Sequence, residues 1–193
     1  GGGITYLRNL LPELVRDPRL DIHVIFHKDQ LGHLPLPSSG VTPHVRNFAN
    51  GFIGRLVWEQ TRLPSVARKL GIDVVYSPAN FGPLFVPASV ILLRNALAVG
   101  DDERRLLKRF YWLVLGIVTR LSIRRSRGVM AVSSYAREAL TSGMPASARD
   151  RVHIVHHGIS PDFSPPPKGT NREDFLLCVG DLYIQKNLHG LLP

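Results

Sequence analysis

The chain has 193 residues, of which 44% are hydrophobic and 20% are charged. This balance is typical of a globular protein with room for one full domain and more, and it excludes an extensively disordered chain. The single cysteine, Cys178, excludes an internal disulfide framework and a cysteine-based metal cluster, and fits a reducing cytosolic setting. The formal net charge of +9 is concentrated at residues 104–127. Such a cluster indicates either an anionic partner, which could be nucleic acid, acidic lipid or a phosphorylated substrate, or simply a solvated helix face.

The hydrophobic pattern predicts alternating helices and strands. In chain order we expect a helix at 4–15, a strand at 22–26, a helix at 56–70, strands at 73–77 and 90–93, a helix at 102–125, a strand at 128–132, a helix at 133–140, strands at 152–155 and 175–179, and the start of a helix at 187–192. Residues 31–51 are rich in Pro, Gly and Ser and predict a long irregular connection. Residues 164–173 include three consecutive prolines and predict a linker between a domain at 1–163 and the start of a second at 174–193.

The expected strands are continuous apolar runs rather than alternating ones. Such runs are typical of a parallel sheet covered by helices on both faces, so we predict a Rossmann-like α/β fold. The first helix directly follows Gly1-Gly2-Gly3, without a strand ahead of it. In doubly wound folds that strand is usually central. We therefore expect its absence to leave two inner sheet edges without a partner and the isolated fragment to be unstable.

The longest uncharged run, residues 74–93, has the length of a membrane span. It contains Pro78, Gly82, Pro83 and Pro87, which a spanning helix rarely carries together, so it predicts strand, loop and strand. The first residues carry neither a charged leader nor an apolar signal core. We expect a cytoplasmic protein.

Two segments have the composition of a phosphate site. Gly2 and Gly3 directly precede a helix, where glycine lets the backbone approach a ligand and the helix N-terminus offers free N–H groups. Lys186 enters a helix after a strand that ends in glycine, where its charge could neutralise a diphosphate. A tight turn and a solvent-facing lysine are the alternatives.

Polar side chains follow two of the predicted strands. Asn80 follows the strand at 73–77, and Arg94 and Asn95 follow the strand at 90–93. In open α/β sheets ligands bind beyond the carboxyl ends of the strands, and amides there can bind sugar hydroxyls as donors and as acceptors. A turn-forming role is an equal alternative for Asn80.

Three histidines, His153, His156 and His157, lie close together in the sequence. His153 and His156 are three positions apart on a strand and so face opposite sides, and no acidic or cysteine ligand is near in sequence. We expect no metal site, and one histidine lining a cleft.

The expected helix at 102–125 is both basic and apolar. We predict that its apolar residues pack on the sheet and that its basic face points outward, where it could also rest on an anionic membrane surface. The arginines that we assign to this face are Arg105, Arg109, Arg120 and Arg124. No Ser-His-Asp, Cys-His or paired-carboxylate pattern stands out, so no catalytic residue is predicted.

Several segments, taken in order, resemble one known family. They are the glycine-rich start, residues 73–78, 128–134 and 152–163, and residues 175–192 with their pattern Gly-x-Leu-x-x-x-Lys-Asn-Leu. Together they are similar to the N-terminal domain of GT-B glycosyltransferases of family 4, followed by the first strand, loop and helix of the nucleotide-sugar domain.

The resemblance implies a retaining transferase of the hexosyltransferase type, active in polysaccharide biosynthesis. It would move a sugar from a nucleotide-diphosphate sugar to a saccharide or lipid-linked acceptor, without a cofactor or bound metal, in the cytoplasm or peripherally on the inner face of the membrane. Gly2 and Gly3 would pack against the donor diphosphate or sugar, and Lys186 would contact the diphosphate. Asn95 would line the cleft near the transferred sugar, with Asn80 nearby.

The sequence departs from the family pattern where Arg94-Asn95 stands, because many members carry a His-Asp pair there. This indicates a subgroup. Since most of the nucleotide-sugar domain is absent, we expect the fragment itself to be inactive.

Two other functions stay open. One is another GT-B enzyme, such as a nucleotide-sugar epimerase. The other is a basic α/β module that binds nucleic acid. Against the second, the basic residues lie on one helix that is half apolar, with no stacking aromatics interleaved on the charged face. We therefore expect no nucleic-acid partner.

Overall fold

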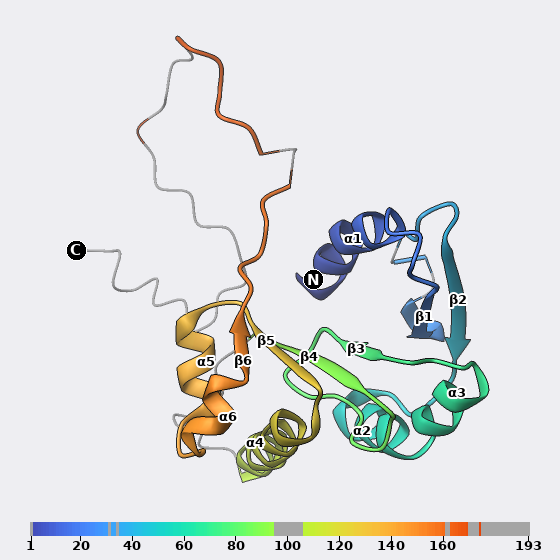
Figure 1. The fold of residues 1–193 in the computed structure, drawn as a ribbon, viewed down its shortest axis with the longest axis vertical. Helices are drawn as coiled ribbons and strands as arrows, with labels where there is room; N and C mark the ends of the chain where they lie inside the picture. Colours follow the sequence, from blue (N-terminus) through green and yellow to red (C-terminus); the bar gives the residue numbers. More distant parts are fainter. Residues whose placement is uncertain are drawn as a thin grey trace.

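The structure, a computed structural model, describes residues 2–30, 32–33, 35–94, 106–160, 163–169 and 174. Helices and strands are interspersed along them (Figure 1). The elements are α1 (Gly2–Val15), β1 (Ile22–His27), a 3₁₀ turn (Lys28–Gln30), β2 (Val41–Arg46), α2 (Gly51–Thr61), α3 (Leu63–Lys69), β3 (Val75–Ser77), β4 (Ser89–Leu93), α4 (Leu106–Arg125), β5 (Gly128–Ala131), α5 (Ser134–Thr141), α6 (Ala146–Asp150) and β6 (Val152–Ile154). The strand expected at 175–179 and the helix start at 187–192 lie outside the described residues, so the second domain stays a prediction.

Four strands form the main sheet, which is parallel throughout, in the order β3-β4-β5-β6. Its central residues are fully buried: Ile91, Leu93, Val129 and Ala131 are each at most 1% exposed. Helices α5 and α6 pack beside β5 and β6, and α4 packs against β4 (Figure 1). Strands buried this completely must be apolar along their whole length, which is why their sequences do not alternate. The predicted α/β class with a Rossmann-like parallel sheet is confirmed.

A second, two-stranded parallel sheet pairs β1 with β2, from Ile22 opposite Val41 to His27 opposite Arg46. The prediction that residues 31–51 are irregular throughout was therefore wrong. Strand β2 contains Pro43 and several half-exposed polar residues, which is the composition of a loop. An edge strand tolerates a proline, because one side of its backbone needs no ladder hydrogen bonds.

The helix expected at 56–70 is two helices, and the first begins earlier, at Gly51. The helix is interrupted at Arg62, because Pro64 has no N–H to donate. A proline is accepted in the first turn of a helix but not in its interior. Gly71 follows the end of α3, with a φ of +67° in the left-handed region. Ser133 caps α5, and its hydroxyl accepts a hydrogen bond from the backbone N–H of Ala136 at 3.1 Å.

Helix α4 does not pack on the sheet through the apolar face that the sequence predicts. Its buried face combines the short polar side chains Thr119 and Ser122, each at most 1% exposed, with the apolar Leu115 and Ile123. The hydroxyl of Ser122 accepts a hydrogen bond from the N–H of Gly82 at 3.2 Å, a contact that requires a short side chain. The large apolar residues Phe110, Leu113, Ile117 and Leu121 are 40–62% exposed. The expectation that such residues pack on the sheet was wrong for these four.

A groove of about 1200 Å³ separates the two sheets. β1 lines one side of it and β3 the other, and helices α1, α2 and α3 contribute further lining residues. Within the described residues, β1 and β3 each have a partner strand on one side only. The expected further strand between them stays a prediction. No helix in the described ranges combines the length and the apolar composition needed to cross a membrane.

Candidate functional site

The carboxyl ends of the main-sheet strands collect side chains from separate parts of the chain. Asn80 follows β3, Arg94 follows β4 and His157 follows β6, and parallel strands all end at the same edge of their sheet. The start of α1 lies at this edge too, because the ring of Tyr6 lies beside the Arg94 guanidinium. We refer to the following residues as the strand-end cluster: Tyr6, Tyr76, Asn80, Arg94 and His157.

Asn80 and Arg94 are joined through the backbone. The backbone N–H of Arg94 donates a hydrogen bond to the Asn80 side-chain oxygen Oδ1 at 2.7 Å. This bond fixes the loop after β3 to the end of β4. The two residues that the sequence assigned to one cleft are thus brought together, and both line the mouth of the groove between the sheets.

The Arg94 side chain extends toward the first turn of α1. Its Cζ lies 5.6 Å from the centre of the Tyr6 ring, within the range of a cation–π contact. Its Nη1 lies 3.4 Å from the point that a Cβ on Gly3 would occupy. A Cβ at Gly3 would therefore touch the guanidinium at about van der Waals distance, so Arg94 lies directly against the first turn of α1.

Tyr6 and Tyr76 share a hydrogen bond of 2.6 Å between their hydroxyl oxygens. Burial, and then the hydrogen bond with Tyr6, raise the pKa of the Tyr76 phenol well above its usual range. The phenol therefore keeps its proton at any physiological pH. This pair ties α1 to β3 and provides neutral hydroxyls at the cluster.

His157 lies beside Tyr6 as well, with 5.0 Å between the ring centres. Partial burial, and then the positive charge of Arg94, lower the pKa of His157 below its ordinary 6.5. At neutral pH the imidazole is uncharged and can both donate and accept a hydrogen bond. Of the three histidines singled out in the sequence, His157 is the one that joins the cluster.

The cluster combines one cation with neutral donors and acceptors. A guanidinium, an imidazole and two phenols suit a ligand with many hydroxyl groups, and the guanidinium also suits an anion. No member of the cluster is a carboxylate or an activated nucleophile. These groups are suited to hydrogen bonding with a ligand, and no catalytic residue is assigned to the cluster.

The remaining predicted site residues are only partly described. Gly2 lies in the first turn of α1, and Arg120 and Arg124 are exposed on α4. Arg109 belongs to α4, but its side chain is not described. Asn95, Arg105 and Lys186 lie outside the described residues.

The two arginines on α4 share their face with the exposed apolar residues. At 100° per residue, Arg120 and Arg124 point to the same side of the helix as Leu113 and Ile117. The predicted separation into an apolar inner face and a basic outer face was therefore wrong. One exposed surface, Phe110, Leu113, Ile117, Arg120, Leu121 and Arg124, carries both kinds of residue, and we refer to it as the α4 surface.

The other two histidines point to separate surroundings. His156 Nδ1 lies 3.1 Å from the backbone oxygen of Val132, and His153 is exposed on β6. In the ranges that the structure describes, no three histidine, cysteine or acidic side chains are grouped so that they could hold a metal ion.

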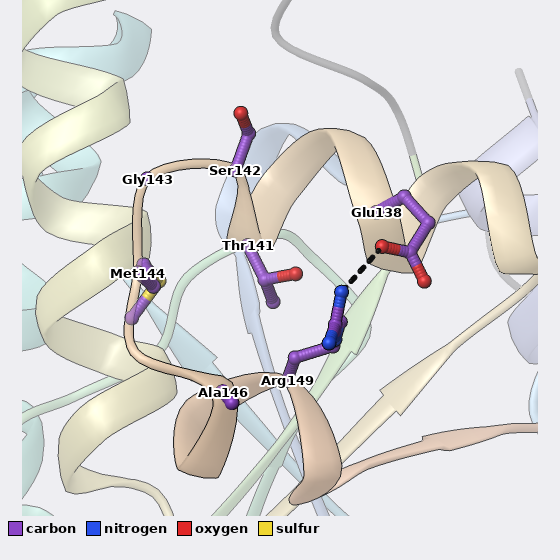
Figure 2. Close-up of a pocket in the computed structure, with 7 residues that line it drawn as sticks. All are labelled: Glu138, Thr141, Ser142, Gly143, Met144, Ala146 and Arg149. Carbon is purple, nitrogen blue, oxygen red and sulfur yellow. Dashed lines mark hydrogen bonds and ion pairs between the residues drawn. The ribbon is translucent and has the colours of Figure 1, made fainter.

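A second pocket lies between α5 and α6 (Figure 2). Its charged side chains neutralise each other, since Arg149 Nη1 lies 3.4 Å from Glu138 Oε2. The hydroxyl of Thr141 is engaged as well, because it donates to the backbone oxygen of Arg137 at 2.8 Å. These contacts leave the pocket without an unmatched charge, so it is a weaker candidate than the strand-end cluster.

The sequence reasoning missed Tyr6 and Tyr76. The available signal was weak: Tyr6 lies one turn after the glycines, and Tyr76 interrupts a valine-rich strand. Only their positions at the same sheet edge reveal the contact.

Comparison with protein families identifies one match. The family model described as Glycosyltransferase Family 4 matches residues 1–163 of the chain. A comparison with curated proteins yields no match.

Proposed function

The chain belongs to Glycosyltransferase Family 4, and on this premise we propose that it takes part in the transfer of a sugar from a nucleotide-diphosphate sugar to a saccharide or lipid-linked acceptor. Membership supports glycosyl transfer in general; the donor, the acceptor, the retention of anomeric configuration and the absence of a metal requirement are the proposal. The observation that carries it is the strand-end cluster. Its neutral donors and acceptors match a polyhydroxylated ligand, and its arginine matches a phosphorylated one.

The donor contacts are proposed to come from two ends of the chain. Gly2 and Gly3 pack their backbone against the diphosphate or the sugar, because glycine allows close approach at a helix start. Lys186 neutralises the diphosphate from the second domain, which begins at residue 174. Asn80, Arg94 and Asn95 line the cleft beside the transferred sugar.

The acceptor is proposed to lie at a membrane surface. The α4 surface supports this, because Phe110 and Leu113 are 62% and 60% exposed beside the exposed Arg120 and Arg124. Apolar side chains that enter the lipid headgroup region, together with arginines that meet anionic lipids, are the composition of a peripheral membrane helix. The enzyme would then work at the cytoplasmic face.

The proposal is tested by binding in a chain that continues through the whole donor domain. We expect a nucleotide-diphosphate sugar to bind, and Lys186→Ala to weaken that binding about tenfold or more, because a charge-assisted contact to phosphate is lost. Isothermal titration against a panel of sugar nucleotides measures both. The exposed linker residue Lys168 supplies the control, since Lys168→Ala removes the same charge and is expected to leave affinity unchanged. A protein that binds no common sugar nucleotide would contradict the proposal.

Two alternative functions would give different results in assays of the same protein. An epimerase would convert the sugar nucleotide without an acceptor. A nucleic-acid-binding module would shift a DNA or RNA probe, with a steep loss of affinity as salt rises.

A further inference from the structure

Each carboxylate that lines the groove, among the residues that the structure describes, lies beside a histidine or an arginine, and the histidines carry a charge only when they are protonated. Asp21 lies 3.3 Å from His23, and Asp29 lies 3.4 Å from His27. The third carboxylate, Glu59, pairs with Arg55 at 2.5 Å. These pairs account for every described carboxylate that lines the groove. Arg94 is the remaining lining guanidinium, and none of the described carboxylates pairs with it.

The position of Arg94 is nevertheless well defined. The bond between its backbone N–H and Asn80 fixes the main chain, and the Tyr6 ring lies beside the guanidinium. An aromatic ring supplies neither a carboxylate nor a carbonyl oxygen. A guanidinium has five N–H donors in a planar fork that matches two oxygens of a carboxylate or a phosphoryl group. These contacts therefore position the Arg94 guanidinium without supplying an anionic acceptor for its N–H groups.

The neighbours of Arg94 add no negative charge. His157 is uncharged at neutral pH, because partial burial and Arg94 lower its pKa, and Tyr76 keeps its proton. The half-buried position of Arg94 also reduces screening by water, which strengthens its attraction for an anion. A negatively charged ligand group at this edge would thus meet one unmatched positive charge among neutral hydrogen-bonding partners.

We propose that Arg94 binds a carboxylate or phosphoryl group of the ligand at the end of β4, so that the strand-end cluster selects an anionic saccharide or sugar phosphate over a neutral sugar. This inference rests on the proposed function and deepens it by naming the class of ligand. Asn80 and Tyr6 act as positioning residues for the guanidinium. The anion belongs either to the saccharide itself or to a diphosphate attached to it.

The test uses the chain extended through the whole donor domain and four probes: glucuronate, glucose 6-phosphate, inorganic pyrophosphate and glucose. Titration of each probe is followed by NMR through the ring protons of His157, which lies beside Tyr6. We expect saturable shifts with the three anions and none with glucose at the same concentration. Tighter binding of the two anionic sugars would assign the anion to the saccharide, and tighter binding of pyrophosphate would assign it to a diphosphate; either supports the proposal.

The variants separate a specific contact from general electrostatics. Arg94→Gln is expected to weaken anion binding about tenfold or more, because charge-assisted hydrogen bonds are lost. Arg94→Lys keeps the charge without the planar fork, so we expect an intermediate loss of anion affinity. This variant replaces Arg94→Gln in the test if the glutamine variant does not fold. Lys69→Gln removes one positive charge from α3 and is expected to change nothing.

Two results would overturn the inference. The first is that glucose binds as tightly as glucuronate. The second is that Arg94→Gln and Lys69→Gln weaken anion binding equally. A chain that binds sugar nucleotides but is insensitive to Arg94→Gln contradicts this inference alone. A chain that binds the anionic sugars through Arg94 but binds no sugar nucleotide, even with a complete donor domain, contradicts the proposed function instead.

Discussion

At the scale of single residues, the strand-end cluster is held by contacts between positions that are distant in sequence. Tyr6 and Tyr76 are 70 positions apart and share a hydrogen bond, and Asn80 accepts from the backbone of Arg94, 14 positions away. Each bond joins two elements: α1 to β3 in the first case, and the loop after β3 to β4 in the second. The same side chains that form the candidate site therefore also connect α1 to the main sheet.

Removing one hydroxyl of the tyrosine pair tests this connection. Tyr76→Phe keeps the ring but leaves the Tyr6 hydroxyl without its partner in a part-buried position. We expect the free energy of unfolding to fall by about 1 kcal/mol, measured by urea denaturation. Tyr135 is 69% exposed, so Tyr135→Phe is the matched control and should change stability by less than about 0.5 kcal/mol. Equal effects of the two variants would show that the pair contributes nothing.

Part of the cluster could be predicted from the sequence, because one general rule applies to it. Ligands bind beyond the carboxyl ends of parallel strands, and Asn80 and Arg94 directly follow two such strands. The tyrosine pair and the choice of His157 among three histidines depend on how α1 and the segment after β6 approach that edge. No local pattern carries this information, since the contacts join segments that are far apart in the chain.

At the scale of elements, burial decides which predictions hold. β4 and β5 were predicted because buried parallel strands must be apolar along their whole length. β2 was missed because an edge strand can hold Pro43 and polar side chains, and so looks like a loop. The buried face of α4 was assigned wrongly because hydrophobicity was taken as the guide. The face that packs inward holds Leu115 and Ile123 together with the short Ser122, which contacts Gly82, and leaves four other large apolar residues outward.

The outward apolar residues of α4 lead to a prediction at this scale. We expect the chain to bind vesicles that contain anionic phosphatidylglycerol, measured by co-sedimentation, and to bind pure phosphatidylcholine vesicles much less. The paired change Arg120→Gln and Arg124→Gln should reduce binding about thirtyfold, because each arginine near an anionic surface contributes about 1 kcal/mol. Phe110→Ser should also weaken binding, since less apolar area enters the headgroup region.

The control for the α4 surface lies on α2. Ile53 is 54% exposed, close to the exposure of Phe110, so Ile53→Ser removes a comparable apolar side chain from another surface. It should leave vesicle binding unchanged. Binding that is insensitive to lipid charge, or that falls equally with Ile53→Ser, would contradict a specific role for the α4 surface.

At the scale of the whole molecule, the two sheets are separate (Figure 1), and residues of both line one groove. β1 and β3 face it, and α1 covers it with residues such as Leu7 and Leu11. Both sheets are parallel, and the start of α1 lies at the carboxyl ends of the main-sheet strands, beside Arg94. A strand placed between β1 and β3 and running parallel to β3 would therefore end where α1 begins.

A designed extension tests whether the groove accepts such a strand. Six alternating valines and isoleucines, added directly before Gly1, should pair with β1 and β3 and join the two sheets into one. Each such side chain that becomes buried contributes about 1.5–3 kcal/mol before the entropy of ordering is subtracted, so we expect a net gain in unfolding free energy of about 2 kcal/mol or more. Slower amide hydrogen exchange in both Ile22–His27 and Val75–Ser77 would identify pairing on both sides. An extension of six alternating serines and glycines is the control, because it adds the same length without apolar area. Protection of one strand only, or an equal gain with the control, would mean that the groove does not hold a strand between the sheets.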